Sequence, residues 1–181
     1  MEYRKTIILK DGRECLLRNG TEKDGKTLLD IFILAHEQTD YLLTYPDETT
    51  MTAEEEGQFL KGMTESSHGI EIVAEIDGVM AGTAGIDAVG LKDKLRHRAE
   101  FGVSVDKAYW GLGIGKALLD ACIECAKKAG YAQLELEVVA ENTRAVEMYK
   151  KAGFVEFARN PKGFRSRISG YQELIGMRLE L

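Results

Sequence analysis

The sequence predicts an α/β fold in which a single mixed β-sheet of about six to seven strands is flanked by helices. One observation is a strand at residues 101–105 that leads through a glycine cluster into a helix at residues 114–129, whose apolar residues recur every three or four positions. A second observation is that hairpins and helices precede this unit, whereas strands and helices alternate after it. Hairpins join antiparallel strands and crossover helices join parallel ones, so both kinds of pairing are expected in one sheet.

Length and charge restrict the class of protein. The chain has 181 residues, of which 44% are hydrophobic and 30% charged, and these values predict one globular domain over residues 1–181. The net charge is −6 without a long basic run, so we expect no nucleic-acid partner. No apolar stretch approaches the ~18 residues of a membrane span, and no signal segment is visible. We therefore expect a cytoplasmic protein without membrane contacts.

The N-terminal part is predicted to contain a hairpin and two helices. Apolar runs at residues 6–9 and 14–17 flank the dipeptide Asp11-Gly12, which is typical of a tight hairpin turn. Capping-box patterns that begin at Thr21 and Thr52 predict the starts of two helices. The polar and aromatic segment between these helices is predicted to be a loop.

The rest of the chain is predicted to supply most of the sheet. Gly130 is expected to end the central helix, Asn142 to cap a further helix, and Gly153 to end it. The basic segment at residues 160–170 is predicted to be a loop. The remaining strands are predicted at residues 70–76, 79–89, 99–105, 131–139, 154–159 and 171–181.

The glycine cluster before the central helix predicts a phosphate site. Glycines allow backbone N–H groups to approach a ligand closely, and the helix dipole favours an anion at the same point. A phosphorylated cofactor is therefore expected there. The residues expected to hold its phosphates are Gly111, Leu112, Gly113, Ile114, Gly115 and Lys116.

Three kinds of phosphate-binding loop compete for this segment. A P-loop is excluded because Trp110 occupies its first glycine position and Ala117 its hydroxyl position. A dinucleotide-binding loop lacks its third glycine, although Glu135 supplies an acid at a suitable distance. Residues 110–115 resemble instead the [Gln/Arg]-x-x-G-x-[Gly/Ala] loop of the GNAT family of N-acetyltransferases, with Trp110 in the Gln/Arg position.

A second motif supports this resemblance. Residues 142–154 resemble the family segment N-x-x-A-x-x-x-Y-x-x-x-G-F, and the two motifs together cover roughly a third of the chain. The resemblance implies an acyl-CoA N-acyltransferase-like fold in which the strands on either side of the central helix splay apart. It also implies acetyl-CoA as cosubstrate, with its pantetheine arm paired to the backbone of the strand Val103, Ser104 and Val105 and hydrogen-bonded to Asn142.

Acetyl transfer from a thioester to an amine requires a base for the ammonium, whose pKa is about 10.4, and an acid for the departing thiolate. Glu137 is the first choice for the base, because its spacing from Tyr149 resembles that of ribosomal-protein alanine acetyltransferases. Glu100 is the alternative base, and either glutamate could be a surface charge. Glu135 lies on the same face of the strand as Glu137 and weakens the choice of Glu137. Tyr149 is the predicted acid, although its helical position also suits a core residue.

The predicted function is an acetyl-CoA-dependent N-acetyltransferase that acts on a primary amine of a small molecule or a protein N-terminus. The alternative is a non-catalytic acyl-CoA sensor or scaffold, because a fold does not guarantee chemistry. Acceptor selectivity is expected to come from residues 38–50 and 160–170, and a homodimer is left open. No metal is expected, since the histidines lack ligand spacing and the pair Cys122 and Cys125 fits core packing better than a metal or redox site.

Overall fold

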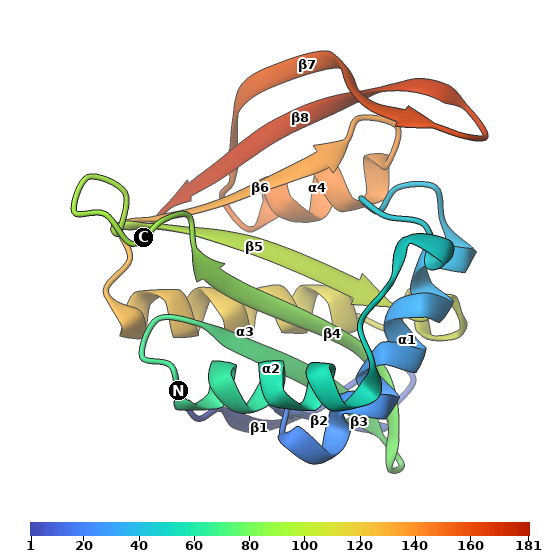
Figure 1. Cartoon of the computed structure of the whole chain (residues 1–181), viewed down its shortest axis with the longest axis vertical. Helices are drawn as coiled ribbons and strands as arrows, with labels where there is room; N and C mark the ends of the chain where they lie inside the picture. Colours follow the sequence, from blue (N-terminus) through green and yellow to red (C-terminus); the bar gives the residue numbers. More distant parts are fainter.

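A computed structural model describes residues 1–181 and contains one eight-stranded mixed sheet with the order β1-β2-β3-β4-β5-β6-β8-β7 (Figure 1). The α/β prediction is confirmed, although the sheet has more strands than the six to seven expected. The strands are β1 (Arg4–Ile8), β2 (Glu14–Asn19), β3 (Ile70–Ile76), β4 (Val79–Ala88), β5 (Arg98–Val105), β6 (Gln133–Val139), β7 (Val155–Ser166) and β8 (Gly170–Glu180). The helices are α1 (Gly25–Gln38), α2 (Ala53–Glu65), α3 (Ile114–Ala129) and α4 (Thr143–Lys151).

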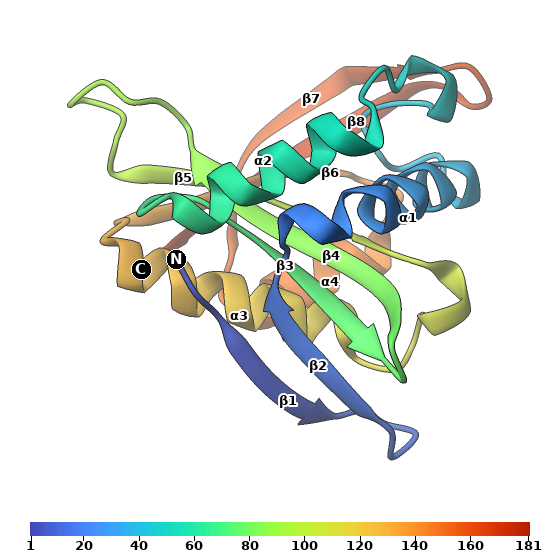
Figure 2. The ribbon, with the colours of Figure 1, turned by 60° about the horizontal axis from the view of Figure 1, so that its bottom comes forward.

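Helices cover both faces of the sheet (Figure 2). The alternation along β3 explains this arrangement, because successive strand residues point to opposite faces. Ile72 and Ala74 join the main core cluster, which holds the apolar stripe of α3. Val73 joins a second cluster with Leu28 of α1 and Leu60 of α2. The sheet is therefore a middle layer with an apolar core on each side.

The glycine and capping signals define the ends of the helices as predicted. The Thr52 hydroxyl accepts a hydrogen bond from the Glu55 amide at 3.2 Å, and the Asn142 side chain accepts one from the Ala145 amide at 3.3 Å. Gly130 ends α3 with a φ of 82°, a left-handed conformation that glycine adopts without strain. The start of α1 differs slightly, because a 3-10 turn (Glu22–Asp24) precedes the helix.

The prediction of a basic loop at residues 160–170 is wrong. Strand β7 continues to Ser166 and pairs with β8, and the register shifts between Asn160 and Phe164. Residues 167–169 form the turn between the two strands. Within this segment the residues that have partners on β8 are Asn160, Phe164, Arg165 and Ser166. Charged side chains do not oppose the pairing, because β7 is an edge strand whose side chains reach solvent.

The cysteines lie in the interior as unpaired thiols. Cys122 and Cys125 belong to the main core cluster, which confirms the prediction that they pack in the core. Burial raises the pKa of the Cys122 thiol well above its ordinary value, so this thiol stays protonated. None of the helices combines the length and the apolar character that a membrane-spanning helix needs.

Candidate active site

The parallel strands β5 and β6 separate part-way along their length. Their pairing ends at Glu100↔Glu135, although both strands continue to Val105 and Val139. A cavity of about 770 Å³ occupies the space beyond the last pair. Of the residues predicted to form the site, all but Leu112 line this cavity: Glu100, Val103, Ser104, Val105, Gly111, Gly113, Ile114, Gly115, Lys116, Glu137, Asn142 and Tyr149.

The glycine loop opens directly into this cavity. Gly111 and Gly113 have φ values of 88° and 100°, which an L side chain rarely adopts, and they turn the chain into the start of α3. The first amides of a helix have no intrahelical acceptor, so they are available to a ligand. The Lys116 ammonium, also in this first turn, pairs with Asp120 at 2.5 Å. The backbone amides and the helix dipole are thus the groups of this turn that are free to attract an anion.

Trp110 connects the glycine loop to strand β5 through a hydrogen bond. The indole Nε1–H donates a hydrogen bond to the carbonyl oxygen of Val105 at 2.7 Å, where β5 ends. The guanidinium of Arg144, from α4, lies 5.5 Å from the indole ring centre. Trp110 therefore links β5, the glycine loop and α4 at the mouth of the cavity, a structural role that the motif alone did not reveal.

The carboxylates on the two separating strands have different surroundings. Glu135 binds the Arg98 guanidinium through two hydrogen bonds of 2.5 and 2.6 Å, so its charge is neutralised. Glu137 and Glu100 line the cavity and make no ion pair of this kind. The structure thus separates Glu135 from the two glutamates that face the cavity, and these two remain as the candidate bases.

Tyr149 lies on α4 with its ring in the core and borders the cavity. The ring is 6% exposed and lies edge-on to Phe101, with 6.1 Å between ring centres. Burial raises the pKa of the Tyr149 phenol, because desolvation disfavours the charged phenolate. The phenol therefore keeps its proton throughout the neutral pH range, as a proton donor must.

The Acetyltransferase (GNAT) family model matches residues 30–154, which include the glycine loop, β6 and α4. This chain belongs to the GNAT family. Among solved structures, it is similar to a GNAT-family acetyltransferase from Streptococcus pneumoniae, with a TM-score of 0.88 and 28% identity, over 92% of this chain and 99% of that one. A Salmonella typhimurium acetyltransferase structure with bound acetyl-CoA shares the fold, with a TM-score of 0.81 and 21% identity, over 92% of this chain and 94% of that one.

The GNAT chain is also similar to an Escherichia coli enzyme named for acetylation of an alanine of ribosomal protein bS18. The two are 36% identical over 81 residues, which are 45% of this chain and 54% of that enzyme. The chain spans about half, or less, of the length of the first curated relatives it matches.

Lys10, in the turn between β1 and β2, is one of several cavity residues that the sequence did not indicate. Its backbone N–H donates to the carbonyl oxygen of Leu112 in the glycine loop at 3.2 Å. The Arg13 guanidinium lies 5.8 Å from the Tyr109 ring centre and makes a second contact with the same region. Since about a hundred residues separate these segments, no local pattern could have predicted their contact.

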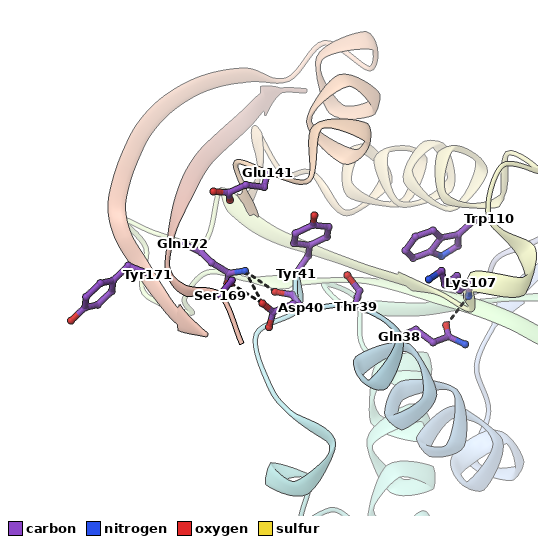
Figure 3. Close-up of a pocket in the computed structure, with 10 residues that line it drawn as sticks. All are labelled: Gln38, Thr39, Asp40, Tyr41, Lys107, Trp110, Glu141, Ser169, Tyr171 and Gln172. Atoms are coloured by element: carbon purple, nitrogen blue, oxygen red, sulfur yellow. Dashed lines mark hydrogen bonds between the residues drawn. The ribbon is translucent and has the colours of Figure 1, made fainter. Parts of the chain in front are cut away.

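A second cavity in this GNAT chain adjoins the first. It has a volume of about 440 Å³ and lies between the end of α1, the glycine loop and the turn before β8 (Figure 3). Thr39, Tyr41 and Trp110 line both cavities, so the two spaces meet at these side chains. The second cavity is lined by Gln38, Thr39, Asp40, Tyr41, Lys107, Trp110, Glu141, Ser169, Tyr171 and Gln172.

Proposed function

We propose that this GNAT chain transfers an acetyl group from acetyl-CoA to a primary amine by direct attack within a ternary complex. The separation of β5 and β6 after Glu100↔Glu135 is the observation that carries this proposal. Beyond this point the edge of residues 101–105 that faces β6 has no strand partner. An extended pantetheine arm can pair with such an edge. The amides of the glycine loop lie at one end of the same cavity, where the pyrophosphate would bind.

The donor and the acceptor would occupy different cavities. The larger one is lined by the glycine loop and by Lys10 and Arg144. The positive charges of these two side chains suit the phosphates of CoA. The smaller one meets it at Thr39, Tyr41 and Trp110, so an amine bound there can approach the thioester. We therefore assign the smaller cavity to the acceptor.

The side chains of the larger cavity can move the protons that the reaction requires. Glu137 would take a proton from the acceptor ammonium, whose nitrogen then forms the new bond to the acetyl carbon. As the carbon–sulfur bond breaks, the Tyr149 phenol would donate its proton to the thiolate. The nitrogen, which is positively charged after its attack, would release its second proton, and this proton restores the phenol. The products are then the neutral amide and the free thiol of CoA. Tyr149 has no ion-pair partner and its burial favours the neutral phenol, which is the form that can donate.

Two measurements test this function. Acetyl-CoA should raise the melting temperature of the protein, because a ligand that binds only the native state stabilises it. In the second, free CoA thiol is measured with L-alanine, an alanine-initiated tetrapeptide, spermidine and kanamycin as acceptors. Thiol release that depends on one of these amines is the expected result. Stabilisation without any amine-dependent release would favour a non-catalytic acyl-CoA sensor, and no stabilisation at millimolar acetyl-CoA would contradict donor binding.

Glu137→Gln is expected to lower turnover most at low pH. There almost all of the acceptor amine is protonated, and the base contributes most. At high pH the amine loses its proton without help, so the variant should approach the parent rate. The measurement is kcat against pH for the parent, Glu137→Gln and Glu100→Gln. If only Glu100→Gln shows this pH-dependent loss, Glu100 is the base and the assignment of Glu137 is wrong.

A further inference from the structure

The carboxylate of Asp40, just after α1, binds side chains from the far end of the chain. Ser166 Oγ donates to its two oxygens at 2.9 and 2.7 Å, and Ser169 Oγ donates to Oδ2 at 2.9 Å. Gln172 Nε2 donates to the Asp40 backbone oxygen at 3.0 Å and to Oδ2 at 3.2 Å. Figure 3 shows the contacts with Ser169 and Gln172 at the edge of the acceptor cavity. We call Asp40, Tyr45, Ser166, Ser169 and Gln172 the Asp40 clamp.

The remaining contacts tie the segment after Asp40 to the same hairpin. The Tyr45 hydroxyl accepts a hydrogen bond from the Arg167 amide at 2.7 Å and lies 3.4 Å from Asp40 Oδ1. The Arg167 guanidinium binds Asp47 at 2.7 Å and lies 4.2 Å from the Tyr45 ring centre. Ser166 and Gln172 are buried, with 9% and 5% of their surfaces exposed, so water competes little for their donors.

The clamp joins the two walls of the acceptor cavity. Thr39, Asp40 and Tyr41 form one wall, and Ser169, Tyr171 and Gln172 form the other. Residues 39–45 belong to no helix or strand, so regular backbone hydrogen bonds do not hold their wall in place. The separation of the walls, and hence the size of acceptor that fits, depends on the side-chain contacts of Asp40.

We propose that Asp40 is a positioning residue that sets acceptor binding by holding these two walls together. The inference rests on the proposed function, because it treats the smaller cavity as the acceptor site. Asp40 does not line the larger cavity, so its loss should leave donor binding and the chemical step intact. A residue that positions only the acceptor wall changes the KM for the acceptor more than kcat.

The first experiment compares Asp40→Ala with the parent protein, using whichever of the four panel acceptors has the highest kcat/KM. The acceptor KM should rise by roughly 10-fold or more, because a displaced wall loses its fit to the substrate. The affinity for CoA and kcat should stay within about 2-fold of the parent values. Asp30→Ala is the matched control, since Asp30 is an α1 aspartate whose exposed carboxylate pairs with Lys26 at 2.6 Å. It should change none of these quantities.

A double-mutant cycle asks whether Asp40 acts through the hairpin. Ser166→Ala removes the hydroxyl that donates to both Asp40 oxygens. If the two residues act as one clamp, the double variant should raise KM little more than Asp40→Ala does. Additive effects on KM would show that Asp40 does not act through Ser166 and would overturn the inference.

The one tryptophan of the chain supplies a readout that does not need turnover. Trp110 lines both cavities, so separation of the walls should expose its ring further. Acrylamide should quench the fluorescence of Asp40→Ala and Ser166→Ala more strongly than that of the parent and Asp30→Ala. A parent protein without amine-dependent thiol release would refute the proposed function. If the parent is active and a folded Asp40→Ala or Ser166→Ala variant has the same acceptor KM and the same quenching as the parent, the clamp is refuted and the proposed function stands.

Discussion

Tyr149→Phe is expected to lower kcat by roughly 10²- to 10⁴-fold, the range usual for a positioned general acid. The substitution removes one hydroxyl and keeps the ring that contacts Phe101 and Phe154. The core around α4 should therefore survive, and the affinity for CoA should change little. Because the proton moves only as the carbon–sulfur bond breaks, kcat and kcat/KM should fall together.

Steady-state kinetics with the best panel acceptor provide the measurement, and Tyr131→Phe provides the control. Tyr131 is another buried tyrosine, whose hydroxyl donates to the His68 carbonyl at 2.9 Å away from both cavities. Its loss should reduce stability without a comparable loss of kcat. A folded Tyr149→Phe protein with the parent kcat would end the assignment of Tyr149 as the acid, and the acetyltransferase function could still stand.

The pH dependence of kcat gives a second check on Tyr149. Burial raises the pKa of the phenol above its ordinary value of about 10, so the acid form persists through neutral and mildly alkaline pH. If Tyr149 is the proton donor, its ionisation should cause no loss of kcat below pH ~10. Activity should decline only where the phenol begins to lose its proton.

Gly113→Asp is expected to weaken CoA binding by about 100-fold or more, because a carboxylate at the start of α3 repels the pyrophosphate and occupies the path of its approach. Gly113 has a φ of 100°, so the substitution also strains the loop that presents the amides. A Cβ at this position meets no atom within 4 Å, and the fold should therefore tolerate it. Isothermal titration with CoA measures the effect.

Gly130→Asp is the matched control for this experiment. Gly130 lies at the other end of α3 with a φ of 82° and equally open space around a Cβ, but far along the helix from the glycine loop. It carries the same backbone strain and the same charge without the phosphate site. If both variants bind CoA as the parent does, the phosphates bind elsewhere. If both lose binding equally, strain in α3 is responsible and the local repulsion is not.

Comparison of the sequence with the structure shows which parts of the site are locally encoded. Gly111, Gly113 and Gly130 adopt the left-handed conformations that glycine alone takes up freely, and Asn142 caps α4 as its side chain suggests. The apolar period of residues 114–129 places α3 against the sheet. These features depend on neighbouring residues, so the sequence determined the fold class, the glycine loop and 12 of the 30 residues that line the larger cavity.

Contacts between distant segments were decided by the tertiary structure alone. Strand β7 continues to Ser166 because the edge of β8 is available to pair with it, whereas the basic composition of this segment had suggested a loop. The Lys10 amide binds the glycine loop, and Asp40 binds Ser166 of the β7–β8 hairpin. Arg98 pairs with Glu135, while Glu137 faces the cavity. The last three contacts join residues between 37 and 126 positions apart. Side-chain periodicity and turn chemistry act over a few residues, so only the packed sheet and helices could bring these groups together.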